Sequence, residues 1–364
     1  MKSQNKICLF LLFFLTINIF SQTKLVTLPR THTAYKTNIS INIDGKVNES
    51  IWEKANWTSN FIDIEGVDDP KYQTKIKMLW DEDFFYILAD IKEPNIWADI
   101  TERDAIIFHN NNFEIFLDPN GNTHNYYEIE INALNTIWDL FLTKPYRELN
   151  SSVINDWNIT GLKSAIGING TLNNPNDIDK GWIVEMAIPW STFKTSYFQD
   201  IVPRNQFWRV NFSRVNWNHT IDKNGTYSRK KNKEDSKYLK EFNWVWSPQG
   251  VVNMHEPEKW GYVLFSSKNI NDINLSDSNT FNIPKDEQIK YTMYNLHRKQ
   301  NRFFKKNKVW IQTMDELIEK DFVIANKKIK LKLELHKTGY NIFATSPFSN
   351  KEFILTEDGE LIVN

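Results

Sequence analysis

The chain has 364 residues and a formal net charge of -1, with 44 lysines and arginines against 45 aspartates and glutamates. This balance argues against a cationic surface, so we expect no nucleic-acid partner. The 14 Trp, 13 Tyr and 24 Phe are many for this length, and such rings either fill β-sheet cores or stack on the apolar faces of sugars.

Residues 1–22 have the pattern of an export signal. Lys2 and Lys6 precede an apolar run, residues 7–19, that is shorter than the ~20 residues a helix needs to cross a bilayer. We therefore expect cleavage, a protein that is secreted or held in the periplasm or at the cell surface, and no transmembrane segment in the mature chain. The single cysteine, Cys8, lies within this signal, so its removal excludes disulfides, thiolate metal sites and a cysteine nucleophile.

Residues 23–266 are expected to form one all-β domain, because short runs with two-residue alternation are separated by Asn, Asp and Gly turns. In 74–80, Ile76 and Met78 share one face of a predicted strand while lysines occupy the other. Further strands are predicted at 84–91, 113–117, 126–132, 136–143, 182–188, 207–214 and 261–265. This number of strands favours an antiparallel, jelly-roll-like β-sandwich. The polar segment 222–240 has no periodicity and is predicted to be a long surface loop.

A small α+β extension is expected after the sandwich. Residues 267–284 are rich in Asn, Asp and Ser and are predicted to be a linker, so 285–364 form a separate C-terminal unit. Apolar spacings of three and four over 286–305 predict an amphipathic helix, and alternation from residue 329 onward predicts a small sheet. This unit is a candidate for docking a protein partner, although basic residues on a helix are more typical of a solvated face.

Polar side chains alternate with apolar ones in several predicted strands. The residues concerned are Glu114, Glu128, Glu130, Asn132, Glu185, Arg209, Asn211 and Ser213. If these strands are neighbours, the polar side chains form a concave patch of carboxylates, amides and a guanidinium, which is suited to sugar hydroxyls that both donate and accept hydrogen bonds. The alternative is a structural ion pair between Glu185 and Arg209, with the other polar residues facing water.

Catalysis is an open alternative, because glycoside hydrolysis also uses a pair of carboxylates. Glu114, Glu128, Glu130 and Asp139 are the nominal candidates for a hydrolase of O-glycosyl compounds or a lyase. No paired-carboxylate signature connects any two of them, so no residue is assigned as catalytic.

The sequence indicates no required cofactor. Oxygen-rich clusters occur around Asp118 and Asn120 and at Asp81 and Asp83, so a structural Ca²⁺ ion is conceivable, but neither cluster matches the twelve-residue calcium loop. The seven histidines show no HExxH spacing, which argues against a zinc enzyme.

A set of segments together resembles the carbohydrate-binding family 9-like proteins, a family related to modules appended to xylanases. The segments are Ile43-Asp44-Gly45 with Ile51-Trp52, Leu79-Trp80-Asp81 with Phe85-Tyr86-Ile87, Phe113-Glu114-Ile115-Phe116-Leu117-Asp118, Gly181-Trp182-Ile183-Val184-Glu185 with Ala187-Ile188-Pro189-Trp190, and Glu256-Pro257 with Trp260-Gly261. The resemblance covers residues 41–265 and implies a single β-sandwich.

The resemblance also implies a sugar site in which two aromatic rings enclose a sugar and polar side chains bond its hydroxyls. The family glutamate corresponds to Glu114, an amide position to Asn211 and the first ring to Phe108. The family arginine is replaced by Glu130 and the second ring by Met254, a change that favours a neutral or cationic ligand over a uronate unless Arg209 or Arg214 compensates. The complete set of expected ligand-binding residues is Phe108, Glu114, Glu130, Asn132, Arg209, Asn211, Arg214 and His255.

The leading hypothesis is therefore non-catalytic binding of an oligo- or polysaccharide in carbohydrate catabolism, through a polar concave face with aromatic stacking. A glycoside hydrolase or lyase that uses the same carboxylates and a structural or assembly module are the alternatives.

Overall fold

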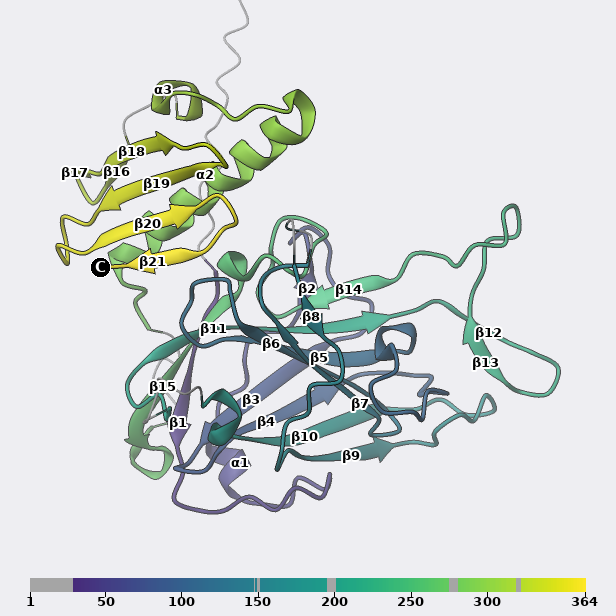
Figure 1. The fold of residues 1–364 in the computed structure, drawn as a ribbon. Helices are drawn as coiled ribbons and strands as arrows, with labels where there is room; N and C mark the ends of the chain where they lie inside the picture. Colours follow the sequence, from purple (N-terminus) through teal and green to yellow (C-terminus); the bar gives the residue numbers. More distant parts are fainter. Residues whose placement is uncertain (1–28, 147, 149–150, 195–200, 275–280, 319–321) are drawn as a thin grey trace, which may run out of the picture.

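The computed structural model describes residues 29–146, 148, 151–194, 201–274, 281–318 and 322–364 (Figure 1). The expected export signal, residues 1–22, lies outside these ranges. Of the helices in the described ranges, none combines the length and the apolar character needed to cross a membrane.

One mixed sheet of 13 strands forms most of the molecule. The strands along its main path are, in spatial order, β8 (Val153–Ile154), β7 (Ile137–Leu142), β6 (Tyr126–Asn132), β5 (Asn112–Asp118), β11 (Phe207–Asn216), β15 (Gly261–Asn269), β1 (Thr31–Lys36), β3 (Thr74–Trp80), β4 (Phe84–Ile91), β10 (Gly181–Pro189) and β9 (Lys163–Asn169). Two further strands branch from this path, since β14 (Phe242–Val245) pairs with both β11 and β2 (Ile62–Asp63). The predicted all-β fold is confirmed.

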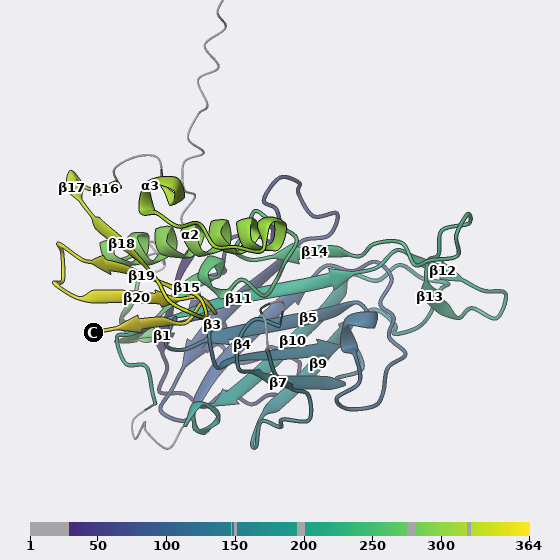
Figure 2. The ribbon, with the colours of Figure 1, turned by 45° about the horizontal axis from the view of Figure 1, so that its top comes forward.

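Strand β1 joins the two halves of the sheet and was not predicted. It pairs in parallel with β15 along most of its length and with β3 only at Tyr35 and Lys36. The two halves on either side of β1 lie as layers over one another (Figures 1 and 2). The expected antiparallel arrangement holds within each half, where β5 pairs with β6 and β11, and β4 pairs with β3 and β10. The parallel strand β1 is the exception.

The main hydrophobic core lies between the two halves. Alternation places one face of every central strand in this core, which explains why the period-two pattern located the strands correctly. One half of the sheet contributes to this core the side chains of Phe113, Ile115, Leu117, Ile129, Ile131, Val210 and Phe212. The other half contributes those of Ile76, Met78, Trp80, Phe85, Ile87, Val184, Met186 and Ile188.

Glu185 belongs to the layer formed by β4, β9 and β10, so it is neither part of the polar patch nor the partner of Arg209. Its carboxylate accepts hydrogen bonds at 3.0 Å from the backbone N–H groups of Asp44 and Gly45 and from the indole N–H of Trp52. Gly45 has φ of +76°, and a Cβ there would lie 2.8 Å from the carbonyl carbon of Ile166. Three of the segments that carry the family resemblance thus meet in one buried hydrogen-bond cluster.

The C-terminal unit packs helix α2 (Lys285–Asn307) on one face of a four-stranded antiparallel sheet. Asp286 and Glu287 in the first turn and Lys305 and Lys306 in the last turn of α2 complement the helix dipole. The sheet strands are β18 (Lys330–Leu335), β19 (Tyr340–Thr345), β20 (Glu352–Thr356) and β21 (Leu361–Val363). A short helix, α3 (Met314–Leu317), and a small hairpin, β16 (Val323–Ile324) with β17 (Lys327–Lys328), precede this sheet. The predicted helix and small sheet are both present.

Two segments differ from the sequence expectation. The predicted loop at 222–240 contains part of a hairpin, β12 (His219–Ile221) with β13 (Tyr227–Arg229), that extends away from the body of the sandwich (Figures 1 and 2). The first residues of the predicted linker continue β15 to Asn269 and then pack Ile270 in a hydrophobic cluster with Trp52. The hairpin forms by local pairing between β12 and β13, whereas Ile270 packs against residues more than 200 positions earlier in the chain.

We expect Glu185→Gln to lower the free energy of unfolding by about 1–3 kcal/mol, because an amide accepts fewer of the three converging N–H groups than a carboxylate does. Urea denaturation measures the change. Glu53→Gln is the matched control, because Glu53 lies exposed on the short helix α1 (Ile51–Lys54) near the same cluster. Equal unfolding midpoints for the two variants would contradict this role of Glu185.

Candidate functional site

The polar faces predicted from alternation do come from adjoining strands. In the sheet β5 lies between β6 and β11, and Glu114 is directly opposite Glu130 on one side and Ser213 on the other. Because residues paired across strands share a face of the sheet, the carboxylates of β5 and β6 and the polar side chains of β11 project in the same direction.

A cavity of about 510 Å³ opens over this face. Its floor comes from β5, β6 and β7. Its walls come from β8, from β14 and the residue before it, and from the segments that follow β2, precede β5, follow β7 or lead into β15. The floor residues are Glu114, Phe116, Glu128, Glu130, Trp138, Leu140 and Leu142. The wall residues are Ile64, Ile106, Phe108, Tyr146, Val153, Asn155, Glu241, Asn243, Val252, Asn253, Met254 and His255.

Three carboxyl groups lie together on the cavity floor. The side-chain amide of Asn112 donates to Glu114 Oε1 at 2.9 Å and to Glu130 Oε2 at 3.1 Å, while Glu128 shares a hydrogen bond with Glu130. Within the described ranges, no lysine or arginine forms an ion pair with Glu114, Glu128 or Glu130. The cluster is therefore connected by hydrogen bonds but is not neutralised by a cationic arginine or lysine side chain.

Burial raises the pKa of all three carboxyl groups. The pKa of Glu114 rises to about 7, and those of Glu128 and Glu130 rise well above their ordinary value because repulsion from the neighbouring carboxylates adds to the effect of burial. The three groups interact and titrate as a unit. Near neutral pH the floor retains protons, so it offers both donors and acceptors of hydrogen bonds.

Aromatic rings stand beside these carboxyl groups. Phe108 and Trp138 are half-buried, and the indole N–H of Trp138 donates to the carbonyl oxygen of Asn155 at 3.3 Å. Phe108 packs edge-on against Trp217, with ring centroids 5.6 Å apart. The sequence predicted Phe108 through its family resemblance, whereas Trp138 was not among the expected residues, because in the predicted strand 136–143 only Asp139 was considered as a candidate.

His255 connects the wall of the cavity to its floor. Its Nδ1 is 2.8 Å from the hydroxyl of Tyr126, its Nε2 is 3.8 Å from Glu128, and its ring lies 4.3 Å from that of Tyr146 between centroids. Phe108, Glu114, Glu130 and His255 are therefore the expected ligand-binding residues that the structure brings together around one cavity.

Arg209 and Arg214, two of the expected ligand-binding residues, do not line this cavity, so neither guanidinium is placed to compensate for Glu130. Arg209 is buried under the C-terminal unit, where it donates to the carbonyl oxygen of Glu258 at 2.6 Å and to the carboxylate of Glu287 at 3.1 Å. Arg214 projects from the opposite face of β11 and pairs with Glu93 at 2.6 Å. Each guanidinium is held by a distant buried carboxylate that sequence alternation does not identify.

Asn132 and Asn211 share the polar face but bind backbone groups, so they too lie outside the cavity lining. Asn211 donates to the carbonyl oxygen of Ser247 and accepts from its N–H, both at 2.9 Å. Asn132 donates to the carbonyl oxygen of Ile100 at 2.8 Å and accepts from the N–H groups of the turn that follows β6. Fewer of the expected residues therefore line the cavity, because backbone groups of loops occupy the side chains of Asn132 and Asn211.

The candidate catalytic residue Asp139 and the oxygen clusters at Asp81 and Asp118 form ion pairs or hydrogen bonds within the protein. Asp139 projects away from the cavity and pairs with Arg103. Asp118 accepts from two backbone N–H groups, and Asp81 accepts from two and from the hydroxyl of Tyr86. The described ranges contain no group of three His, Cys, Asp or Glu side chains placed to hold a metal. The carboxylates of Asp81 and Asp118 thus accept hydrogen bonds from the turns that follow their strands.

Comparison with known proteins gives a consistent family. The sequence model of the family described as "Carbohydrate family 9 binding domain-like" matches residues 43–266. Exoglucanase XynX of Acetivibrio thermocellus is 27% identical over 150 residues, which is 41% of this chain and 12% of that protein. Endo-1,4-beta-xylanase A of Thermotoga maritima is 29% identical over 162 residues, which is 42% of this chain and 12% of the relative. The chain thus spans about an eighth of the length of the curated relatives it matches.

Two solved structures are also similar to the chain. A protein from Bacteroides uniformis aligns with a TM-score of 0.47 and 16% identity, covering 65% of this chain and 99% of that one. A carbohydrate binding module family 9 from Caldicellulosiruptor kristjanssonii, solved in complex with cellotriose, aligns with a TM-score of 0.37 and 16% identity, covering 68% of this chain and 100% of that one.

The raised pKa values predict how pH changes stability. A carboxyl group whose pKa is higher in the folded protein than in the unfolded chain stabilises the fold at low pH, and this contribution is lost as pH rises through the folded pKa. Between the unfolded value of about 4.3 and the folded value of Glu114, about 7, the cluster makes the free energy of unfolding fall with increasing pH. Glu130→Gln removes one ionisable group and weakens this fall.

We therefore expect Glu130→Gln to be more stable than the wild type at pH 8, by on the order of 1 kcal/mol, and to differ less at pH 5. Thermal unfolding of both proteins at the two pH values measures this. Glu65→Gln is the control, because Glu65 is exposed on a loop outside the floor cluster. A constant difference between Glu130→Gln and wild type at all pH values would show that folding does not raise the pKa of Glu130.

Proposed function

The chain belongs to the family of carbohydrate family 9 binding domain-like proteins, and from this premise we propose that it binds a saccharide, without cleaving it, in the cavity over β5, β6 and β7. The observation that carries the proposal is the combination, in a single hollow of about 510 Å³, of three hydrogen-bonding carboxyl groups with half-buried aromatic rings. Cavities of roughly 300–1,000 Å³ with a few convergent polar groups are typical of small-ligand sites.

The chemistry of the lining suits a polyol. Each sugar hydroxyl both donates and accepts, and the partly protonated groups Glu114, Glu128 and Glu130 supply both functions. The rings of Phe108 and Trp138 provide apolar faces for the C–H groups of a pyranose, and such rings lose little conformational entropy on binding. A saccharide satisfies both parts of the lining at once.

The charge of the lining favours neutral or cationic saccharides over uronates. Glu241 joins the three floor carboxyl groups around the cavity, whereas Arg209 and Arg214 are held elsewhere by Glu287 and Glu93. A carboxylate on the ligand would meet like charges without a guanidinium to pair with it.

We further propose that this binding takes place outside the cytoplasm, in the use of polysaccharides. The motivation is the export pattern of residues 1–22 in the sequence. Two of the relatives, an exoglucanase and an endo-1,4-beta-xylanase, have names that describe enzymes acting on such polymers, and the matched region is a small part of each.

Binding to an array of neutral, amino-sugar and uronic-acid oligosaccharides tests the proposal. We expect binding to neutral or amino-sugar oligomers and none to oligouronates. Phe108→Ala and Trp138→Ala should each weaken binding on the order of tenfold, which corresponds to the ~1.4 kcal/mol expected for losing one stacking ring. Phe303→Ala is the matched control, because Phe303 is partly exposed on α2 and lies outside the cavity lining.

Two results would overturn this function. One is the absence of binding to any oligosaccharide by the wild-type protein. The other is hydrolysis or elimination of a bound glycan that disappears in Glu114→Gln or Glu130→Gln, since this would identify the floor carboxyl groups as catalytic. Binding of oligouronates alone would contradict the charge argument while leaving saccharide binding intact.

A further inference from the structure

The C-terminal unit is fastened to the sandwich by buried polar contacts. On the sandwich side, Arg209 and the hydroxyl of Tyr262 both donate to Glu287 of α2, at 3.1 and 3.0 Å. The hydroxyl of Thr123 donates to the carbonyl oxygen of Gly359 at 2.8 Å, next to the final strand of the unit. These contacts place α2 against the end of the sheet face that carries the cavity.

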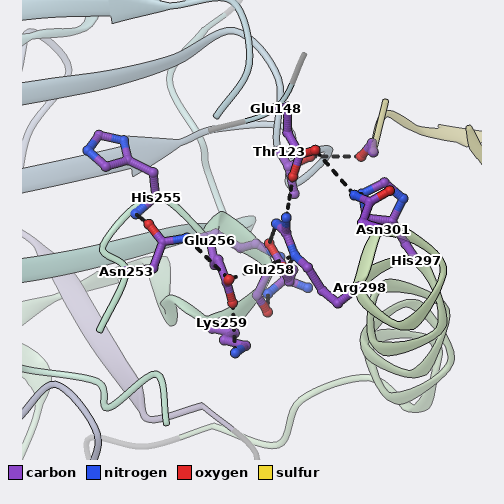
Figure 3. A network of polar contacts seen from close by, with 12 residues as sticks. Thr123, Glu148, Asn253, His255, Glu256, Glu258, Lys259, His297, Arg298 and Asn301 are labelled. Carbon is purple, nitrogen blue, oxygen red and sulfur yellow. Dashed lines mark hydrogen bonds and ion pairs between the residues drawn. The ribbon is translucent and has the colours of Figure 1, made fainter. Parts of the chain in front are cut away.

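Arg298 of α2 makes contacts of a different kind, because its guanidinium joins two separate sandwich segments (Figure 3). Nε donates to Glu258 Oε1 at 2.8 Å and Nη2 donates to Glu258 Oε2 at 3.2 Å, while Nη1 donates to Glu148. Asn301, one turn along the helix, donates to the other carboxylate oxygen of Glu148 at 3.2 Å. The side chains of Arg298 and Glu258 are 16% and 2% exposed, so solvent screens this ion pair only weakly.

The two segments that Arg298 joins form one side of the cavity wall. Glu148 follows Tyr146 by two residues, and Glu258 follows His255 by three; Tyr146 and His255 both line the cavity. Their rings touch, with centroids 4.3 Å apart, which brings the two segments together at the cavity as Arg298 brings them together at the helix. We call Tyr146 and Glu148, together with residues 252–258, the clamped rim.

A series of hydrogen bonds and a longer ion pair connect Arg298 to the cavity lining through the clamped rim. Asn253 accepts from the backbone N–H of His255 at 3.2 Å and donates to Glu256 at 3.2 Å, and Lys259 pairs with the same Glu256 at 2.7 Å (Figure 3). Glu256 also lies 4.0 Å from Arg298. The position of His255 is thus tied to the helix through a short series of charged and amide side chains.

We propose that Arg298 is a positioning residue through which the C-terminal unit sets the conformation of the clamped rim, and with it the saccharide affinity of the cavity. This inference rests on the proposed function for its effect on affinity, but its effect on the rim holds in the ligand-free protein. Because coupling between two sites is reciprocal, a saccharide that contacts the rim also strengthens docking of the C-terminal unit.

The test compares Arg298→Gln, Arg298→Lys and Arg302→Gln in the full-length chain. Arg302 is exposed one turn further along α2 and serves as the matched control. In the ligand-free protein we expect Arg298→Gln to increase amide hydrogen exchange in 252–258 by at least about tenfold, within the usual range for coupled sites, and to leave exchange in β4 unchanged. Arg298→Lys should give an intermediate increase, because lysine keeps the charge and loses the bidentate geometry.

The second measurement is the affinity for cellotriose and for the neutral and amino-sugar oligomers of the array. Arg298→Gln should weaken binding about tenfold, with Arg298→Lys in between and Arg302→Gln like the wild type. Unchanged exchange in 252–258 overturns the inference, and so does increased exchange with unchanged affinity. If the wild type binds none of these glycans, the proposed function fails, while the exchange comparison still decides whether Arg298 holds the rim.

Discussion

A charge buried in a β-sheet face must be paired, shared or protonated, and this constraint organises the molecule. The face formed by β5, β6 and β11 carries Arg209 at one end and three glutamates in the middle. Arg209 is satisfied by a carboxylate from outside the sandwich, on α2. The glutamates receive no such partner from the described chain and instead share protons and the amide of Asn112. The cavity lies where the chain leaves this polar surface uncovered.

The same constraint explains how the C-terminal unit is attached. Arg209 of the sandwich pairs with Glu287 of the helix, and Arg298 of the helix pairs with Glu258 of the sandwich. Because each side supplies one arginine and one glutamate, sliding the helix along the sheet would break two buried ion pairs at once. The pairs therefore specify one docking position, and that position puts α2 in contact with the segments that border the cavity.

Parts of the candidate site were predictable because they depend on alternation and on short motifs. Glu114 and Glu130 were recognisable as polar residues inside apolar strands, and their register across β5 and β6 follows from the pairing of those strands. Asn112 and Trp138 were not predicted, although each occupies the same alternating phase as a predicted residue on its own or a neighbouring strand. Starting the predicted strand 113–117 one residue earlier would have included Asn112, whereas Trp138 shares the face of Glu130 only through the register between β6 and β7.

The sequence alone determined most of the sandwich strands, although not β1, and it determined the C-terminal helix and the polar alternation of β5, β6 and β11, because period-two and period-3.6 burial are properties of neighbouring residues. Only the tertiary structure decided which polar residues remain available to a ligand. Asn132 and Asn211 form hydrogen bonds with loop backbone groups, so they are not available to a ligand. Arg214 projects from the other side of β11, and Arg209 pairs with Glu287 on a helix far along the chain. Such coverage depends on contacts between residues tens to hundreds of positions apart, which local periodicity does not encode.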